Sequence, residues 1–394
     1  MANSTGVRLV GRRGAPRVGA RPAPADYVPA PGLSVPVVTI LDPAGNVLED
    51  EQRAVVRWAV QEGAGADIIF AAGTTGEWDR LDNPRRQQIA RVVTDECRRI
   101  AAAGTVVEAW IGITARTRAE TLENLDYAME LGAEAAVVAP LSIGDADDPV
   151  AFVNREIDAL FERRGRQIPI FLYDNAEIAA PGRPPHMHTR DVKQMSRMEY
   201  VRGVKVTAGK AVLGNYTRAV SHFNRGGDFA IYAGDPYLIF DLFAPPQGIR
   251  GWARHYWNRY WTRDSLPYGI VAGPANVMPR EWQRALRVCR HGDLALMNRY
   301  AGVLGEFRAA CQFVRRGSAV RPTLACLKTA LVEMGICRSA ALAPGTPALE
   351  ESERREFARR FKELRRRAAA TLEPGWLSHQ EPERSALRSA RENA

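Results

Sequence analysis

The chain has few lysines and no metal-binding arrangement of cysteines. Only five of its 54 basic residues are lysines, so the place of each lysine is informative. Its five cysteines form no CxxC or Cys/His pattern, which argues against a zinc site and a disulfide framework and favours buried thiols in a reducing compartment. No stretch approaches the roughly 20 apolar residues that a membrane span needs, and the arginine-rich start lacks the apolar core of a secretory signal. These absences predict a cytoplasmic protein that does not act at a membrane.

The excess of positive charge does not indicate a nucleic-acid partner. The net charge of +9 and the pI near 9.5 would do so if the charge were clustered on one face. Much of it is instead scattered or terminal, and residues 1–22 carry five arginines and no acidic residue. Solvated tails account for this pattern. A nucleic-acid role would predict strongly salt-dependent binding that disappears without residues 1–30.

Apolar runs of strand length alternate with helical patterns along most of the chain. The eight candidate strands are 35–41, 67–72, 106–113, 135–139, 168–173, 200–206, 229–233 and 268–272. Alternation of this kind over about 250 residues favours a closed (β/α)8 TIM barrel, with an open doubly wound sheet as the main competitor. Only helical patterns follow, at 280–291, 293–314, 321–335 and 350–370, so we expect a C-terminal helical extension.

Four segments follow from this pattern. We expect a disordered tail over 1–30, the barrel over 31–279, a helical region over 280–370 and a mobile tail over 371–394. The barrel contains an aromatic insertion at about 241–266, directly after the seventh strand. One interpretation is a helix that packs its aromatic stripe on the barrel or on a neighbouring subunit. The other is a lid that walls the pocket with Trp252, Trp257 or Trp261.

The second candidate strand ends in a turn with the sequence Gly-Thr-Thr-Gly-Glu, residues 73–77. Gly73 and Gly76 allow the backbone to approach a ligand closely, while Thr74 and Thr75 supply hydroxyl and amide donors. In a barrel this turn would lie at the C-terminal mouth, where barrel enzymes keep their chemistry. The motif alone is compatible with a simple turn and with a carboxylate-binding cradle.

A lysine lies near the end of the sixth candidate strand. Period-two alternation puts Gly203, Lys205 and Thr207 on one face of the strand and Val204 and Val206 on the other. The lysine then points into the barrel, where a charged amine is costly. It is either held in an internal salt bridge, or it is an amine whose pKa is lowered by burial and which forms Schiff bases with carbonyl substrates.

The fifth candidate strand ends at Tyr173, which the same alternation points toward Lys205. A phenol in this position can act as a general acid or base, although a single tyrosine at a strand end is often ordinary packing. The remaining lysines lie in helical or loop contexts and are predicted to be surface or helix-packing residues: Lys193, Lys210, Lys328 and Lys362.

Taken in order, these motifs resemble those of a known family. Gly73-Thr74-Thr75-Gly76-Glu77, Tyr173, Gly203-Val204-Lys205, Ala233-Gly234-Asp235 and Gly273-Pro274-Ala275-Asn276 are similar to motifs of the dihydrodipicolinate synthase/N-acetylneuraminate lyase family. The resemblance covers roughly residues 33–370. It implies a (β/α)8 barrel, a pyruvate-type 2-oxo acid substrate, no metal or organic cofactor, and a homodimer or homotetramer.

The resemblance also implies roles for individual residues. Lys205 would be the Schiff-base lysine, Tyr173 the proton-transfer residue, and Thr74 and Thr75 the carboxylate-binding pair. Gly73 and Gly76 belong to the same substrate-binding turn. Four further residues are candidates for the substrate pocket: Ile178, Leu141, Gly234 and Ala272.

Two departures from the family concern the second substrate. The synthase branch carries an arginine five residues after the strand-five tyrosine to hold a second carboxylate, and Ile178 occupies that place here. Its Pro-Tyr-Tyr at the end of strand four reads Pro140-Leu141-Ser142, so the tyrosine that is lent across the dimer is absent. Both differences argue against a role in lysine biosynthesis.

We therefore expect a class I aldolase or lyase that makes or breaks a carbon-carbon bond of a 2-oxo acid, with an aldehyde as co-substrate or product. A first alternative is a 2-oxo sugar-acid dehydratase that uses the same Schiff base. A second is a catalytically inactive barrel that acts as a binding or regulatory subunit, which the missing tyrosine and the basic tails would suit.

Overall fold

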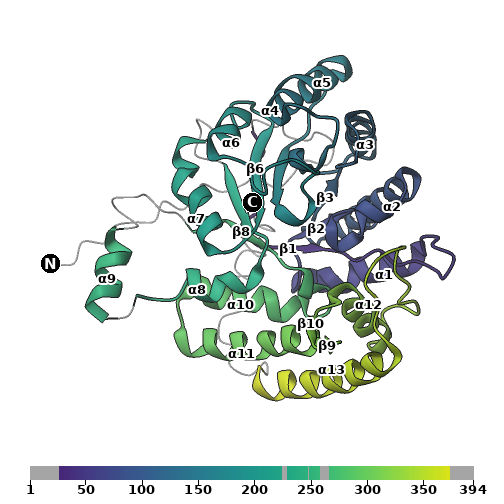
Figure 1. The fold of residues 1–394 in the computed structure, drawn as a ribbon, viewed down its shortest axis with the longest axis vertical. Coiled ribbons are helices and arrows are strands. Elements are labelled where there is room, and N and C mark those ends of the chain that lie inside the picture. Colours follow the sequence, from purple (N-terminus) through teal and green to yellow (C-terminus); the bar gives the residue numbers. More distant parts are fainter. Residues whose placement is uncertain (1–25, 224–228, 247, 258–265, 373–394) are drawn as a thin grey trace.

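Eight parallel strands close into a barrel in which each strand pairs with the next along the chain and β8 pairs with β1 (Figure 1). The computed structural model describes residues 26–223, 229–246, 248–257 and 266–372. The strands are β1 (Leu33–Pro36), β2 (Ile68–Ala71), β3 (Glu108–Gly112), β4 (Ala135–Val138), β5 (Ile170–Asn175), β6 (Val201–Thr207), β7 (Ala230–Ala233) and β8 (Gly269–Val271). All eight overlap the predicted runs, and the expected TIM barrel is confirmed.

Helices connect the strands and cover the barrel. Those between β1 and β8 are α1 (Glu49–Val60), α2 (Asn83–Ala102), α3 (Arg118–Leu131), α4 (Pro149–Ala151), α5 (Asp158–Arg164), α6 (Thr189–Met195), α7 (Lys210–Ala219), α8 (Ile239–Leu242) and α9 (Gly248–Tyr256). A π-helical turn at Phe152–Ile157 joins α4 to α5. The apolar residues between strands and helices form a layer that we call the outer core, and it includes Val204 and Val206 of β6.

The barrel interior is filled by a separate set of apolar side chains, the inner core. The rings of Trp110 and Phe171 stack with their centroids 3.9 Å apart, and Tyr232 meets Trp110 edge-on at 5.1 Å. Aromatic rings of this size fill a barrel of eight strands without leaving a pore.

Residues 26–30, which the sequence placed in a disordered tail, are part of the folded barrel. Tyr27 is buried in the inner core, and its hydroxyl donates a hydrogen bond to Glu108 at 2.5 Å. Arg202 donates to the Tyr27 carbonyl at 2.9 Å, and Tyr232 donates to the carbonyl of Ala30 at 2.6 Å. This segment closes the end of the barrel at which the strands begin. The sequence did not predict this segment to be folded because a single tyrosine creates no periodic pattern. The rest of the first predicted tail, residues 1–25, and the second, from residue 373 to 394, lie outside the described ranges.

The C-terminal region consists of helices, as expected, together with one hairpin. The helices are α10 (Pro279–His291), α11 (Leu294–Ala310), α12 (Thr323–Glu333) and α13 (Glu351–Thr371). The helix predicted over 293–314 ends at Ala310, and β9 (Phe313–Arg315) pairs antiparallel with β10 (Ser318–Val320). In Figure 1 these elements lie together on one side of the barrel.

The aromatic insertion is partly described. Phe240 and Phe243 are partly buried against the outer core, whereas Trp252 and Trp257 are exposed. Figure 1 shows α9 standing away from the barrel beyond α8. Trp261 lies outside the described residues, so the lid remains a prediction.

The structure bears on two further expectations, which concern the cysteines and membrane-spanning segments. All five cysteines are free and buried, which confirms their interpretation as buried thiols. None of the helices in the described ranges is long and apolar enough to cross a membrane.

Candidate active site

Lys205 and Tyr173 meet inside the barrel, as the alternation of β5 and β6 predicts. The two residues are paired in the register of these strands. The Nζ atom of Lys205 lies 3.6 Å from the centroid of the Tyr173 ring and 5.0 Å from that of Phe70. Both Lys205 and Tyr173 are more than nine-tenths buried. No carboxylate among the described residues forms an ion pair with this amine.

Burial perturbs both groups. Desolvation lowers the pKa of Lys205, although the neighbouring Tyr173 opposes the shift. Burial by itself raises the pKa of Tyr173, but the charge of Lys205 and the hydrogen bond with Thr74 outweigh it, so the pKa falls below its ordinary value of 10.0. Burial thus makes the neutral form of Lys205 easier to reach, and a neutral amine is a nucleophile.

The Tyr173 hydroxyl forms hydrogen bonds with polar side chains beside it. It shares a hydrogen bond of 3.2 Å with Thr74 Oγ1 and accepts one of 3.0 Å from Asn175 Nδ2. Asn175 also accepts from the backbone N–H of Glu177. Sequence reasoning did not assign Asn175 to the site, although its position two residues after Tyr173 on the same strand face could have identified it.

The turn at 73–77 lies at the C-terminal end of β2 and carries Thr74 to the Tyr173 hydroxyl. A Cβ atom at Gly73 would lie 2.7 Å from the Phe70 ring, so glycine is required there. Thr39 donates a hydrogen bond to the Gly76 carbonyl at 2.8 Å, which ties the turn to the segment after β1. Thr75 lies beside Gly273 at the end of β8. The turn is therefore part of the same barrel mouth as Lys205.

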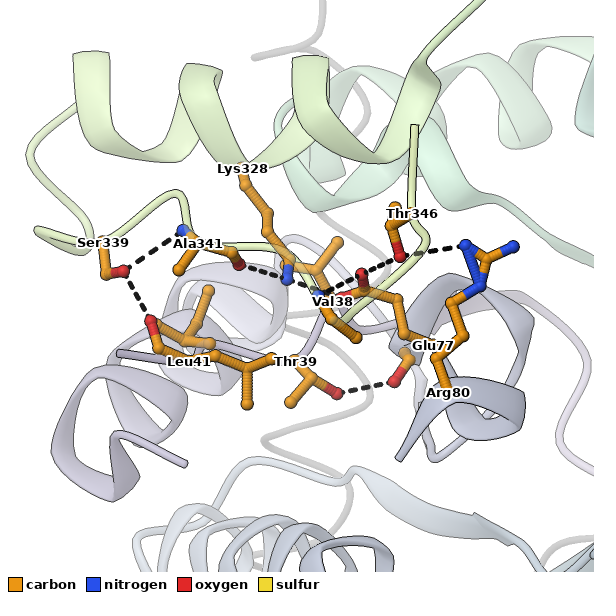
Figure 2. Close-up of polar contacts among 12 residues, drawn as sticks. Val38, Thr39, Leu41, Glu77, Arg80, Lys328, Ser339, Ala341 and Thr346 are labelled. Carbon is orange, nitrogen blue, oxygen red and sulfur yellow. Dashed lines mark hydrogen bonds and ion pairs between the residues drawn. The ribbon is translucent and has the colours of Figure 1, made fainter. Parts of the chain in front are cut away.

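Glu77, the last residue of this turn, forms a buried ion pair with Lys328 of α12 (Figure 2). The two side chains are fully buried, and Lys328 Nζ lies 2.5 Å from the Glu77 carboxylate. The same carboxylate accepts hydrogen bonds from the Ala343 N–H at 2.9 Å and from Thr346 Oγ1 at 2.7 Å. Lys328 is thus a helix residue, as predicted, but it is not on the surface. The pair fastens the C-terminal region to the turn that carries Thr74 and Thr75.

The four candidate pocket residues separate into two groups. Ile178 packs against the inner core. Gly234 lies against β6, because a Cβ atom there would be 2.1 Å from Thr207 Oγ1. Leu141 and Ala272 belong to the outer core, and their place in the substrate pocket remains a prediction. The described residues contain no cluster of three or more His, Cys, Asp or Glu side chains that could hold a metal ion.

Comparison with known proteins finds similarity to dihydrodipicolinate synthases. Residues 29–142, which include the turn at 73–77, match the model of the Dihydrodipicolinate synthetase family. A 4-hydroxy-tetrahydrodipicolinate synthase from Thioalkalivibrio sulfidiphilus is 25% identical over 266 residues, which are 67% of this chain and 76% of that protein.

Two solved structures share the fold. Dihydrodipicolinate synthase from Bacteroides thetaiotaomicron has a TM-score of 0.68 at 18% identity, covering 86% of this chain and 99% of its own. YagE, a prophage protein of Escherichia coli K12 from the dihydrodipicolinic acid synthase family solved in complex with pyruvate, has a TM-score of 0.63 at 21% identity, covering 85% and 98%. Both likenesses support the barrel with its C-terminal helices.

Proposed function

We propose that the chain is a member of the dihydrodipicolinate synthase/N-acetylneuraminate lyase family, whose members are lyases, and that it is a class I aldolase acting on a pyruvate-type 2-oxo acid. The observation that carries this proposal is the buried amine of Lys205 against the ring of Tyr173, without a carboxylate to hold its charge among the described residues. Pyruvate in the YagE structure supports the choice of donor.

The chemistry begins at Lys205. Its neutral amine adds to the C2 ketone of the 2-oxo acid and water leaves, which gives an iminium. The iminium accepts the electron pair of the C3–H or C3–C4 bond, so that an aldehyde can be added or released. Tyr173 transfers the proton in these steps, and it is held for this purpose by Thr74 and Asn175. Thr74 and Thr75 bind the C1 carboxylate and orient the reacting carbons.

The second substrate differs from that of the lysine-biosynthetic synthases. Ile178 packs against the inner core where those enzymes have an arginine, and an isoleucine gives a carboxylate no partner. The outer-core position of Leu141 likewise supplies no hydroxyl in place of the tyrosine of the synthase branch. We therefore propose an activity outside lysine biosynthesis, in a cytoplasmic homodimer or homotetramer, which light scattering coupled to gel filtration would test.

Borohydride trapping tests the proposal. Sodium borohydride reduces an iminium to a stable secondary amine, so incubation with pyruvate should leave a mass increment on the peptide that contains Lys205. Lys205→Arg should abolish the increment, whereas Lys210→Arg on the surface of α7 should retain it. If no short 2-oxo acid gives an adduct at Lys205, the mechanism is wrong.

Product analysis separates the alternatives. An aldolase yields a 2-oxo acid plus an aldehyde, whereas a 2-oxo sugar-acid dehydratase keeps the carbon skeleton or loses carbon dioxide. Binding of 2-oxo acids without any trapped adduct would instead indicate the inactive binding subunit.

A further inference from the structure

A cavity of about 300 Å³ lies between the barrel mouth and the C-terminal region. Thr74, Thr75 and Gly273 line it from the barrel side, and Glu177 lines it next to Ile178. The opposite wall comes from the segment that begins α12 and from the loop before α13: Arg321, Pro322, Thr323, Leu324, Leu327, Thr346 and Pro347. Because Thr74 contacts the Tyr173 hydroxyl, this cavity adjoins the proposed Schiff-base site.

Arg321 is the only cationic side chain among the described residues that line this cavity. It is exposed, and within the described ranges it forms no ion pair. Its side chain donates one hydrogen bond, of 3.3 Å, to the neutral Oε1 of Gln312. A guanidinium offers a planar fork of donors that matches a carboxylate or phosphate group. The charge of Arg321 is thus available to a ligand.

The wall that carries Arg321 is fixed to the barrel. Lys328, two turns further along α12, is held by Glu77, and Thr346 on the other side of the cavity is bound to the same carboxylate (Figure 2). The first turn of α12 also lines the cavity, and the positive end of a helix dipole favours an anion. A wall whose backbone is fixed before the ligand arrives loses little entropy on binding.

We propose that Arg321 binds an anionic group, a carboxylate or a phosphate, at the far end of the second substrate. This inference rests on the proposed function and names its substrate class. Glu177, on the cavity wall next to Ile178, forms no ion pair in the described part of the chain and repels an anion from that side. The anion is therefore received from the C-terminal region, whereas the synthases receive it from the position of Ile178.

The role of Arg321 can be tested without knowledge of the natural aldehyde, by comparing imine formation for pairs of 2-oxo acids that differ in a terminal anionic group. The carboxylate arm compares 2-oxoadipate and 2-oxopimelate with 2-oxohexanoate and 2-oxoheptanoate, which have the same chain lengths but no terminal charge. The phosphate arm compares 2-keto-3-deoxy-6-phosphogluconate with 2-keto-3-deoxygluconate. Half-saturating concentrations are read from adducts trapped at Lys205, and each is normalised to that of pyruvate.

In at least one arm, the anionic compound should saturate the protein at a concentration at least tenfold lower than its uncharged match. The ratio of the half-saturating concentration of the uncharged compound to that of the anionic compound should fall to about one in Arg321→Gln and should increase in Glu177→Gln. Arg316→Gln, an exposed arginine on the β9–β10 turn, should leave it unchanged. Equal half-saturation in both arms, or a preference that survives in Arg321→Gln, overturns the inference while adducts with pyruvate keep the proposed function intact. Loss of the pyruvate adduct itself would refute the proposed function.

Discussion

The protein buries two of its five lysines, and their surroundings are opposite in character. Lys328 lies between α12 and the turn after β2, where Glu77 neutralises its charge at 2.5 Å and the Ala341 carbonyl accepts a second hydrogen bond at 2.7 Å. Lys205 lies inside the barrel against the ring of Tyr173, and no carboxylate in the described ranges pairs with it.

The difference shows how one residue type serves two purposes. Burial lowers the pKa of both amines. At Lys328 the Glu77 carboxylate opposes this shift and favours the charged amine, which connects two regions of the chain. At Lys205 the partner is a phenol, which is charged only when it has itself lost a proton, so the neutral amine remains accessible. The presence or absence of a carboxylate decides between structure and reactivity.

Replacement of Lys205 should give the largest effect. Lys205→Arg keeps a cation in the barrel but cannot form an imine, so the trapped adduct should disappear and turnover should fall by at least about a thousandfold. Mass spectrometry of the borohydride-treated protein and steady-state kinetics measure the two effects. Lys328→Arg, which keeps the ion pair with Glu77, is the control. An adduct elsewhere in Lys205→Arg would contradict the assignment.

Tyr173→Phe removes the proton-transfer group but keeps the ring against Lys205. We expect kcat to fall by about 10²–10⁴-fold, the usual contribution of a general acid or base. The phenol raises the pKa of Lys205, so its loss should move the midpoint of the pH profile for imine formation to lower pH. In the wild-type protein the midpoint should already lie below 10.5, the ordinary value for lysine. A midpoint that moves upward in Tyr173→Phe would reverse the sign of this coupling.

Lys328→Met should act on stability. It leaves the buried Glu77 carboxylate without its cation, which costs about 3–5 kcal/mol in the free energy of unfolding. Arg338→Gln is the matched control, because its ion pair with Glu51 has an arginine side chain that is 92% exposed and is worth about 0–1 kcal/mol. Denaturant unfolding measures both.

A second variant distinguishes two causes of the lost stability in Lys328→Met, the unpaired charge of Glu77 and altered packing around the methionine. Adding Glu77→Gln to Lys328→Met removes the uncompensated charge and should recover part of the lost stability. An equal loss in the single and double variants would mean that packing, and not charge, dominates at this position.

The fold and the catalytic pair could be predicted because they depend on local periodicity. Buried parallel strands appear as separate apolar runs, and alternation along β5 and β6 gives the inward direction of Tyr173 and Lys205. The hairpin at Phe313–Arg315 and Ser318–Val320 was missed because its apolar residues continued the helical pattern of α11. The two residues of its turn, Arg316 and Gly317, have φ of +49° and +80°; the glycine favours such a turn, but the arginine before it gives no turn signal.

The contacts that complete the site were not local. Glu77 and Lys328 are 251 residues apart, and only the packing of α12 on the barrel brings them together. The cavity at Arg321 has the same origin, since Thr74 and Arg321 line it from parts of the chain that are far apart in sequence. Tyr27 lies in a segment rich in proline and alanine, and no periodic pattern in that segment marks its place beneath the barrel.

Asn175→Asp would place a carboxylate near Lys205, as Glu77 lies near Lys328. Of the predicted effects on activity in this comparison, its effect is expected to be the smallest. Asn175 contacts the Tyr173 hydroxyl at 3.0 Å, so an aspartate there places a carboxylate at the edge of the site with little change in volume. A negative charge nearby raises the pKa of a lysine. The midpoint of imine formation should therefore rise by about one pH unit, which slows the step about tenfold at neutral pH.

Asn175→Ala separates this charge from the lost hydrogen bond. It removes the donor to Tyr173 without adding a carboxylate, so turnover should fall only a few-fold, about the worth of one hydrogen bond, while the midpoint stays near that of the wild type. If Asn175→Asp and Asn175→Ala show the same midpoint, then a carboxylate at this position does not reach the amine, and the contrast with Lys328 depends on distance as well as on the type of partner.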